Sequence, residues 1–183
     1  MKTLASAAVL FLALALGNLA GCTSSDNMKK SPDVADSIRN SLSQAGLKDV
    51  KVSQDRDKGV VTLSGSTTTD LEKAQAESIA KGVASSQVIA NEIAVRPTGD
   101  ESTARTVDSD TDKAIDKNLH AVLVKNRLND DVNYDVKNGV VTLKGHVNSQ
   151  GKRAMAEKLA SNVPNVKQVV NELEVKGQKA TSS

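Results

Sequence analysis

The sequence is poor in the residues that most chemical sites need. Among 183 residues there is no tryptophan, one tyrosine (Tyr134) and one phenylalanine (Phe11), which excludes base-stacking platforms and aromatic cages for cations. One cysteine (Cys22) and two histidines (His120 and His146) cannot build a closed Cys/His zinc site or a disulfide framework. With 24 Lys and Arg against 22 Asp and Glu, the net charge of +2 argues against a nucleic-acid partner held by basicity.

Catalytic patterns are also missing from the sequence. No P-loop, no dinucleotide-binding glycine motif after a strand and no Ser-His-Asp order is found. Asp130 and Asp131 form an adjacent carboxylate pair, but neighbouring side chains point apart and such residues favour turns. We therefore expect a protein that is not an enzyme, with no catalytic residue, no metal and no cofactor.

The first 21 residues have the features of an export signal. A positive start is followed by an apolar run over residues 4–16, which is too short to cross a bilayer but suits a secretory signal. The tetrapeptide Leu19-Ala20-Gly21-Cys22 that follows resembles the bacterial lipoprotein lipobox, in which the cysteine is acylated. A signal peptide with a chance cysteine is the alternative. By the same resemblance, Thr23 in place of aspartate favours the outer membrane, on its periplasmic side. Residues 22–32 are polar and small, and we expect a flexible tether there.

The remaining sequence contains an internal repeat of two copies. The stretch Gly59–Gly65 (GVVTLSG) recurs as Gly139–Gly145 (GVVTLKG), and NEIAV at residues 91–95 recurs as NELEV at residues 171–175. Both pairs are 80 residues apart, which places one copy at residues 33–96 and the other at 112–176. Two copies indicate a tandem duplication and not a solenoid. The polar residues 97–111 between them predict a linker or flexible loop, and residues 177–183 a disordered tail.

Each copy predicts the element order α-β-β-α-β. Apolar residues at helical spacing mark the first helix, namely Val34, Ile38, Leu42 and Ala45, then Ile115, Leu119, Val122 and Leu123. The second helix begins at Thr69 or Ser149, and its expected inner face is Leu71, Ala76, Ile79, Ala80 and Val83, or Met155, Ala156, Leu159, Ala160 and Val163. One strand follows at residues 88–95 or 169–175. The fold class is α+β, with two helices on a three-stranded mixed sheet per module.

Each module has about 65 residues, which is marginal for independent stability. We therefore expect the outer sheet faces, which carry Val60 and Thr62 or Val140 and Thr142, to pack on the other module.

The repeated GVVTL strands, the A-x-A-E pattern of the second helices and the closing NE strands resemble the BON domain family. The resemblance covers both copies, and the plan as a whole resembles dual-BON outer-membrane lipoproteins. It implies a non-enzymatic envelope-maintenance protein, and some of the proteins it resembles bind anionic phospholipid. It also implies an alternative, because soluble periplasmic relatives of the OsmY type are linked to osmotic stress and would act through protein contacts.

The first helix of the second copy carries a basic stripe opposite its apolar face. The stripe is formed at spacings of 4, 3, 4 and 3 by Lys113, Lys117, His120, Val124 and Arg127. The matching residues of the first copy are Asp36, Asn40 and Ser43. A solvated helix face explains such a stripe equally well, whereas the functional reading is a surface for anionic lipid headgroups. Lys152 and Arg153, at the start of the last helix, form a second candidate patch.

Overall fold

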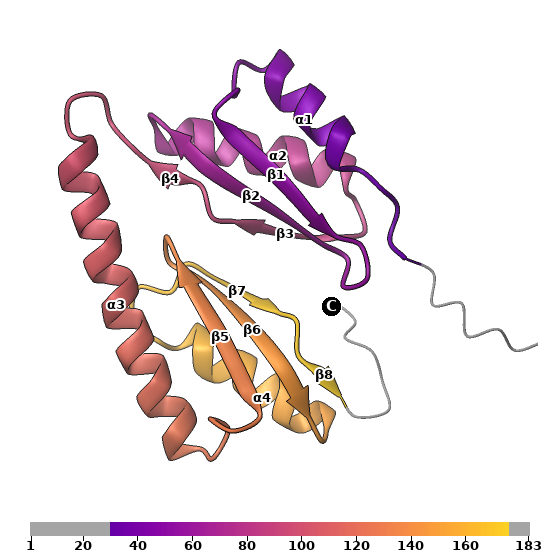
Figure 1. Cartoon of the computed structure of the whole chain (residues 1–183), viewed down its shortest axis with the longest axis vertical. Coiled ribbons are helices and arrows are strands. Elements are labelled where there is room, and N and C mark those ends of the chain that lie inside the picture. Colours follow the sequence, from indigo (N-terminus) through magenta and orange to yellow (C-terminus); the bar gives the residue numbers. More distant parts are fainter. Residues whose placement is uncertain (1–29, 176–183) are drawn as a thin grey trace, which may run out of the picture.

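The computed structural model describes residues 30–175. The expected signal and lipobox with Cys22, most of the tether and the expected tail at residues 177–183 lie outside them. The first module consists of α1 (Ala35–Gln44), β1 (Val50–Asp55), β2 (Val60–Thr67), α2 (Asp70–Val83), β3 (Val88–Asn91) and β4 (Ala94–Val95). The second consists of α3 (Glu101–Lys125), β5 (Val132–Lys137), β6 (Val140–Val147), α4 (Gln150–Ser161), β7 (Gln168–Asn171) and β8 (Glu174–Val175). In each module two helices cover one face of a mixed sheet (Figure 1), which confirms the predicted α+β class.

The central strand of each sheet pairs antiparallel with the strand before it and parallel with the strands after it. The prediction of one continuous last strand per module is wrong, because β3 and β4 are separate, as are β7 and β8, and all four pair with the central strand. The break lies at Ile93, whose side chain is buried in the core and whose N–H donates to the Asn91 side chain at 3.3 Å. Leu173 and Asn171 repeat this arrangement at 3.2 Å.

The predicted starts of α2 and α4 are confirmed. Thr69 accepts a hydrogen bond from the Glu72 N–H at 3.2 Å, and the Glu72 carboxylate accepts from the Thr69 N–H at 3.3 Å, which completes a capping box. Ser149 caps α4 by accepting from the Lys152 N–H at 3.2 Å. These caps fix where the helices begin and therefore which residues turn toward each sheet.

Each module has its own apolar core between helices and sheet, centred on Ile38, Leu42 and Leu63 in one and Leu119 and Leu143 in the other. Two expected core residues are not part of it, since Leu71 is 78% exposed and Met155 is 42% exposed. The buried face of α2 is set by Ala76 and Ala80, and that of α4 by Ala156 and Ala160. At 100° per residue, Leu71 lies about 140° away from Ala76 and so faces solvent.

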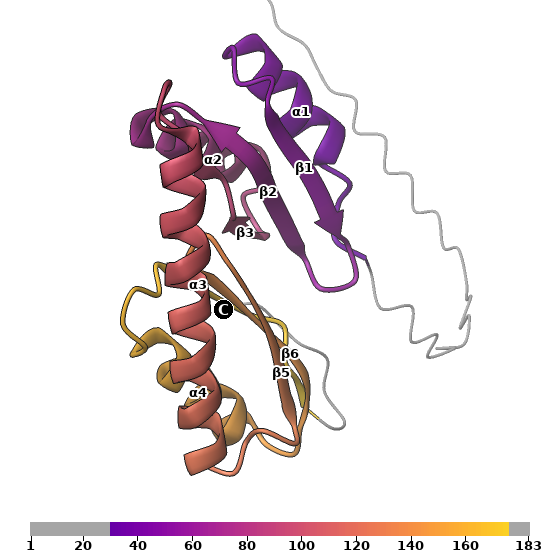
Figure 2. The same ribbon diagram turned by 60° about the vertical axis from the view of Figure 1, so that its left-hand side comes forward.

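The segment expected as a linker or flexible loop, residues 97–111, is helical from Glu101 onward. Glu101–Lys125 form one continuous α3, so that only residues 97–100 remain outside regular structure. The C-terminal half of α3 packs on its own sheet through Ile115 and Leu119, while its N-terminal half extends alongside the first module (Figures 1 and 2). The Arg96 guanidinium forms an ion pair with Asp108 and ties this half to the end of β4.

The outer sheet faces meet each other, as the repeat predicts. A third apolar cluster, formed by residues of both modules, contains Val60, Val88, Ala90, Val140 and Val170. Between the sheet edges, the Gln168 side chain donates to the Ile89 carbonyl at 2.6 Å and accepts from the Asn91 N–H at 3.1 Å. The two modules thus share a partly apolar, hydrogen-bonded interface.

Candidate functional site

The C-terminal half of α3 separates an apolar side from a basic side. Ile115, Leu119 and Leu123 are buried against the sheet of the second module. Lys113, Lys117, His120 and Val124 are exposed, and Val124 shows 47% of its surface. The predicted stripe is therefore present on the helix as far as Val124.

Arg127, the last member of the stripe, lies beyond the helix. α3 ends at Lys125, and Arg127 adopts a left-handed backbone with φ of 55°. The Leu128 N–H donates to the Leu123 carbonyl at 3.0 Å and closes the turn. In the first module the same place, four residues after Leu42, is taken by Gly46 with φ of 82°. Arg127 is exposed beside the end of α3 and not on its helical face.

Ion pairs divide the basic residues into two groups. Lys113 pairs with Asp110 at 3.2 Å on the same helix. Within residues 30–175, no ion pair forms at Lys117, His120, Lys125 or Arg127. Lys125 was not identified from the sequence, although its place in the last turn, one residue after Val124, was visible there. We refer to the exposed set Lys117, His120, Val124, Lys125 and Arg127 as the basic surface.

The second candidate patch does not join the basic surface. The Lys152 ammonium pairs with Asp131 at 3.0 Å and links the start of α4 to the segment before β5. Arg153 is only 8% exposed, and its guanidinium donates to the Asn171 carbonyl at 3.3 Å. The corresponding residue of the first module, Lys73, donates to the Ile93 carbonyl at 2.7 Å. Burial, together with the nearby Lys167, lowers the pKa of Lys73. Both side chains therefore support the strand break of their module.

A groove of about 560 Å³ runs between α3 and β5. Its charged lining is balanced, with the bases Arg96, Arg105, Lys113 and Lys117 and the acids Asp108, Asp112, Asp116 and Asp135, and Tyr134 and Val136 also line it. The Tyr134 hydroxyl donates to the Asp116 carbonyl at 3.2 Å, and its burial beside Asp116 raises the pKa of Tyr134. Lys113 and Lys117 thus face this groove as well as solvent, whereas His120 and Val124 do not line it.

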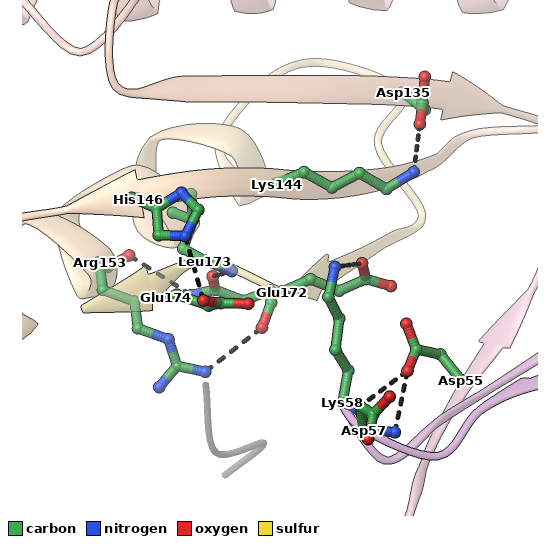
Figure 3. A network of polar contacts seen from close by, with 11 residues as sticks. Asp55, Asp57, Lys58, Asp135, Lys144, His146, Arg153, Glu172, Leu173 and Glu174 are labelled. Carbon is green, nitrogen blue, oxygen red and sulfur yellow. Dashed lines mark hydrogen bonds and ion pairs between the residues drawn. The ribbon is translucent and has the colours of Figure 1, made fainter. Parts of the chain in front are cut away.

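Polar contacts also connect the two modules (Figure 3). Lys58, in the β1–β2 turn, forms an ion pair with Glu172 at 2.8 Å. Lys137 and Glu92 make the reciprocal contact at 3.0 Å. The two glutamates occupy equivalent positions in the repeat, whereas the lysines do not, because the counterpart of Lys58 is Asn138. Lys144 lies nearby, and its hydrogen bond to Asp135 raises the pKa of the ammonium.

Two kinds of site are absent from residues 30–175. No group of three or more His, Cys, Asp or Glu side chains there could hold a metal ion. Among the helices of the same region, none combines the length and hydropathy that a membrane span requires.

Comparison with known proteins identifies both modules. The BON domain matches residues 31–97 and again residues 111–177. The chain is 31% identical over 132 residues to the osmotically-inducible protein Y of Escherichia coli K12. That alignment covers 71% of this chain, and the chain spans 64% of the length of the relative.

Solved structures of CdsD, a structural protein of the type III secretion system of Chlamydia trachomatis, also align with the chain. One aligns at 18% identity with a TM-score of 0.30 and covers 76% of this chain and 60% of that structure. A structure of the C-terminal domain of CdsD aligns at 18% identity with a TM-score of 0.29, and 76% and 64% of the two chains are covered. The two BON matches coincide with the two copies of the internal repeat, and the chain therefore belongs to the BON domain family and carries two copies of the domain.

Proposed function

We propose that this protein is a non-enzymatic, lipid-anchored module on the periplasmic side of the outer membrane, where its second BON domain binds anionic phospholipid and so supports envelope integrity. The observation that carries the proposal is the basic surface, whose exposed cations have no ion-pair partner within the described chain. The matching positions of the first domain hold Asp36, Arg39 and Ser43, and Arg39 forms an ion pair with Asp36.

The charges of the basic surface suit a membrane that carries negative headgroups. A basic residue close to such a surface contributes about 1 kcal/mol, so Lys117, Lys125 and Arg127 together contribute about 3 kcal/mol at low salt. Val124 is the apolar residue among them and can enter the headgroup layer.

The anchor supplies the permanent attachment in this proposal. Support comes from the lipobox-like Leu19-Ala20-Gly21-Cys22, and two or more acyl chains on Cys22 would hold the protein stably at a bilayer. Mass spectrometry of the mature protein tests this directly. We expect an N-terminal residue Cys22 with attached acyl chains, and a Cys22→Ser variant without them. An unmodified mature form that begins elsewhere would contradict the anchor.

Vesicle flotation tests the lipid-binding surface. The chain from Thr23 to Ser183 lacks the acylation site and contains every described residue. We expect it to float with vesicles of anionic lipid, less so in 1 M salt, where the screening length falls to about 3 Å. A Lys117/Lys125/Arg127→Ser variant should bind about a hundredfold more weakly, from about 3 kcal/mol.

The matched control for flotation removes three exposed cations from other places. Lys48 and Lys51 lie in the first domain and Lys158 lies on α4, and each is exposed with no ion pair within residues 30–175. A Lys48/Lys51/Lys158→Ser variant therefore has the same net charge as the test variant. Equal flotation of the two variants would reduce lipid binding to an effect of net charge and contradict the proposed surface.

The second candidate is an osmotic-stress protein that acts through contacts with outer-membrane or periplasmic proteins, with the anchor only placing it. The similarity to the osmotically-inducible protein Y favours this candidate. Wild-type protein that fails to float with any vesicle, while its abundance in cells rises with medium osmolarity, would support it over lipid binding.

A further inference from the structure

The apolar part of the contact between the two modules is small. Within residues 30–175, the cluster that both modules form has four buried side chains, none larger than valine, namely Val60, Ala90, Val140 and Val170. Each module core has thirteen buried residues, leucines and isoleucines among them. Domains joined by a small and partly polar interface generally move relative to each other. Burial of the shared cluster is therefore a minor contribution beside that of either core.

Charged side chains supply much of the remaining contact (Figure 3). Three ion pairs cross from one module to the other and join Lys58 to Glu172 at 2.8 Å, Lys137 to Glu92 at 3.0 Å, and Arg96 to Asp108. The side chains of Glu172 and Glu92 are only 10% and 16% exposed. Carboxylates this far from water lose hydration, which they regain when the modules separate. The charges thus hold the interface together and also lower the cost of opening it.

Lys144 extends this charge network beyond the direct ion pairs. Its hydrogen bond to Asp135 raises the pKa of the ammonium, and the nearby Glu172 and Glu92 raise it further. The attraction between Lys144 and Glu92 crosses the interface. Salt weakens attraction of this kind, since the screening length falls from about 10 Å at 0.1 M to about 3 Å at 1 M. The force that holds the modules together therefore depends on ionic strength.

The covalent connection between the modules contains one place where rotation can occur. Residues 96–100 join β4 to α3 outside helix and strand, and Gly99 there has φ of 93° with no atom within 4 Å of an added Cβ. α3 belongs to the second module, because Ile115 lies in its core and the Asp112 carboxylate accepts from the N–H groups of residues 138 and 139 at 2.8 and 2.9 Å. Rotation at residues 96–100 can thus part the sheets and leave both cores intact.

We propose that the two modules separate reversibly by rotation about residues 96–100, and that salt favours the separated form by screening the charges that join them. At low ionic strength the ion pairs and the hydrogen bonds of Gln168 hold the outer sheet faces together. At high ionic strength these faces become accessible while each module keeps its fold. This inference does not depend on lipid binding, because none of these residues belongs to the basic surface.

The test measures the distance between two nitroxide labels by double electron–electron resonance. The full chain with Cys22→Ser, in detergent micelles, carries the labels at Gln75→Cys on α2 and Lys158→Cys on α4, two exposed positions. We expect one narrow distance distribution in 0.05 M sodium chloride. In 1 M sodium chloride a longer distance should become about fivefold more populated. Labels at Lys48→Cys and Gln75→Cys, both in the first module, should keep one distance in both solutions and report an intact fold.

A double variant tests whether the charges between the modules cause the change. Glu92→Gln/Glu172→Gln should show the longer distance already in 0.05 M salt, with little further change in 1 M. The matched control is Asp36→Asn/Asp110→Asn, which loses the same charge from ion pairs that lie within α1 and within α3. We expect the control to respond to salt as wild type does.

Sucrose at the osmolality of 1 M sodium chloride separates charge screening from a lower water activity, and we expect it to leave the distance unchanged. An inter-module distance that is the same in both salt solutions would overturn the proposal, and wild type alone decides this. An equal effect of sucrose, or an equal response of the two double variants, would also overturn it. A salt-dependent distance within the first module would assign the change to that module and not to separation.

Discussion

Arg127 holds a backbone conformation that glycine tolerates much better than arginine. Its φ of 55° is left-handed, a region that costs a residue with a Cβ about 1–2 kcal/mol. At the same place the first domain uses Gly46, and both turns close by the same leucine-to-leucine hydrogen bond. The second domain therefore keeps a cation at the end of α3 where stability alone favours glycine.

We expect Arg127→Gly to raise the free energy of unfolding by about 0.5–1 kcal/mol, because relief of the left-handed strain exceeds the added entropy of the unfolded chain. The same variant should bind anionic vesicles about fivefold more weakly, since it loses one cation near the headgroups. Urea denaturation and flotation measure the two effects.

The converse substitution, Gly46→Ala, is the control for Arg127→Gly. A Cβ added at Gly46 has no atom within 4 Å, so only the backbone conformation opposes it. We expect a loss of about 1 kcal/mol. If Arg127→Gly were instead destabilising, the Arg127 side chain would be part of the fold and not of a binding surface.

Single residues also show what helical spacing could and could not predict. Arg153 was assigned to a surface patch because it is charged, yet it lies three residues before Ala156 and on the same side of α4. That spacing indicated an inward position. Leu71 is the opposite case, since its apolar side chain suggested the core while its angular position indicated solvent. In both cases the position on the helix decided burial, and the residue type did not.

Among the elements, α3 departs most from the sequence-based expectation. Residues 101–111 have no apolar periodicity, and Val107 is exposed, so no pattern in the sequence indicated a helix there. Once the packed half from Ile115 onward has formed, extending a helix costs little per residue. The extension is then held by contacts that the sequence does not reveal, namely those of Asp108 with Arg96 and of Asp112 with the β5–β6 turn.

We expect Asp108→Ala to loosen the N-terminal half of α3 without unfolding the second domain. The Arg96–Asp108 pair is partly buried, and its loss should cost about 1 kcal/mol. Hydrogen exchange of residues 101–110 should quicken about fivefold, while that of β6 should stay unchanged. Asp110→Ala removes an ion pair whose two side chains are exposed and should have no comparable effect. Equal protection in both variants would show that other contacts hold the extension.

The hydrogen bonds at the start of α2 make the stability of the first domain depend on pH in the acidic range. The Thr68 side chain and backbone donate to the Glu72 carboxylate, and these hydrogen bonds lower its pKa below the ordinary value of 4.5. Because the pKa of Glu72 is lower in the folded than in the unfolded state, its carboxylate stabilises the fold at pH values above the unfolded-state pKa. This stabilisation is lost as the pH falls through the folded-state pKa. Urea denaturation between pH 6 and pH 3 should show a smaller loss for Glu72→Gln than for wild type. An equal loss would mean that the carboxylate does not contribute.

For the whole molecule, the repeat predicted that the modules would pack on each other but not how. The matching Val60 and Val140, on outer sheet faces, indicated an apolar contact, and that contact is confirmed. Gln168 was not anticipated, because the first module has Val88 at its place and the repeat gives no reason for the change. Its side-chain amide donates to the Ile89 carbonyl and accepts from the Asn91 N–H, which are the backbone groups that a neighbouring strand would pair with. One asymmetric residue thus joins the edges of two similar sheets.

We expect the two modules to unfold in one transition, and the position of the single tyrosine makes this measurable. Tyr134 is the sole tyrosine, so tyrosine fluorescence reports on the second module alone, whereas far-ultraviolet circular dichroism reports on both. In wild type we expect the two signals to give coincident urea transitions. Gln168→Glu replaces the donor to Ile89 by a carboxylate, and the unmade hydrogen bond should weaken the interface by about 1–3 kcal/mol. The two transitions should then separate.

Gln75→Glu makes the same chemical change on the exposed face of α2 and should leave the transitions coincident. Gln168→Val restores the residue of the first module, so it removes the two hydrogen bonds without placing a charge against the Ile89 carbonyl. Its effect should therefore lie between those of wild type and Gln168→Glu, because replacing a polar group by an apolar one of similar size is milder than leaving an unpaired charge. Coincident transitions in Gln168→Glu would mean that the apolar cluster and the two lysine–glutamate pairs couple the modules without the bridging amide.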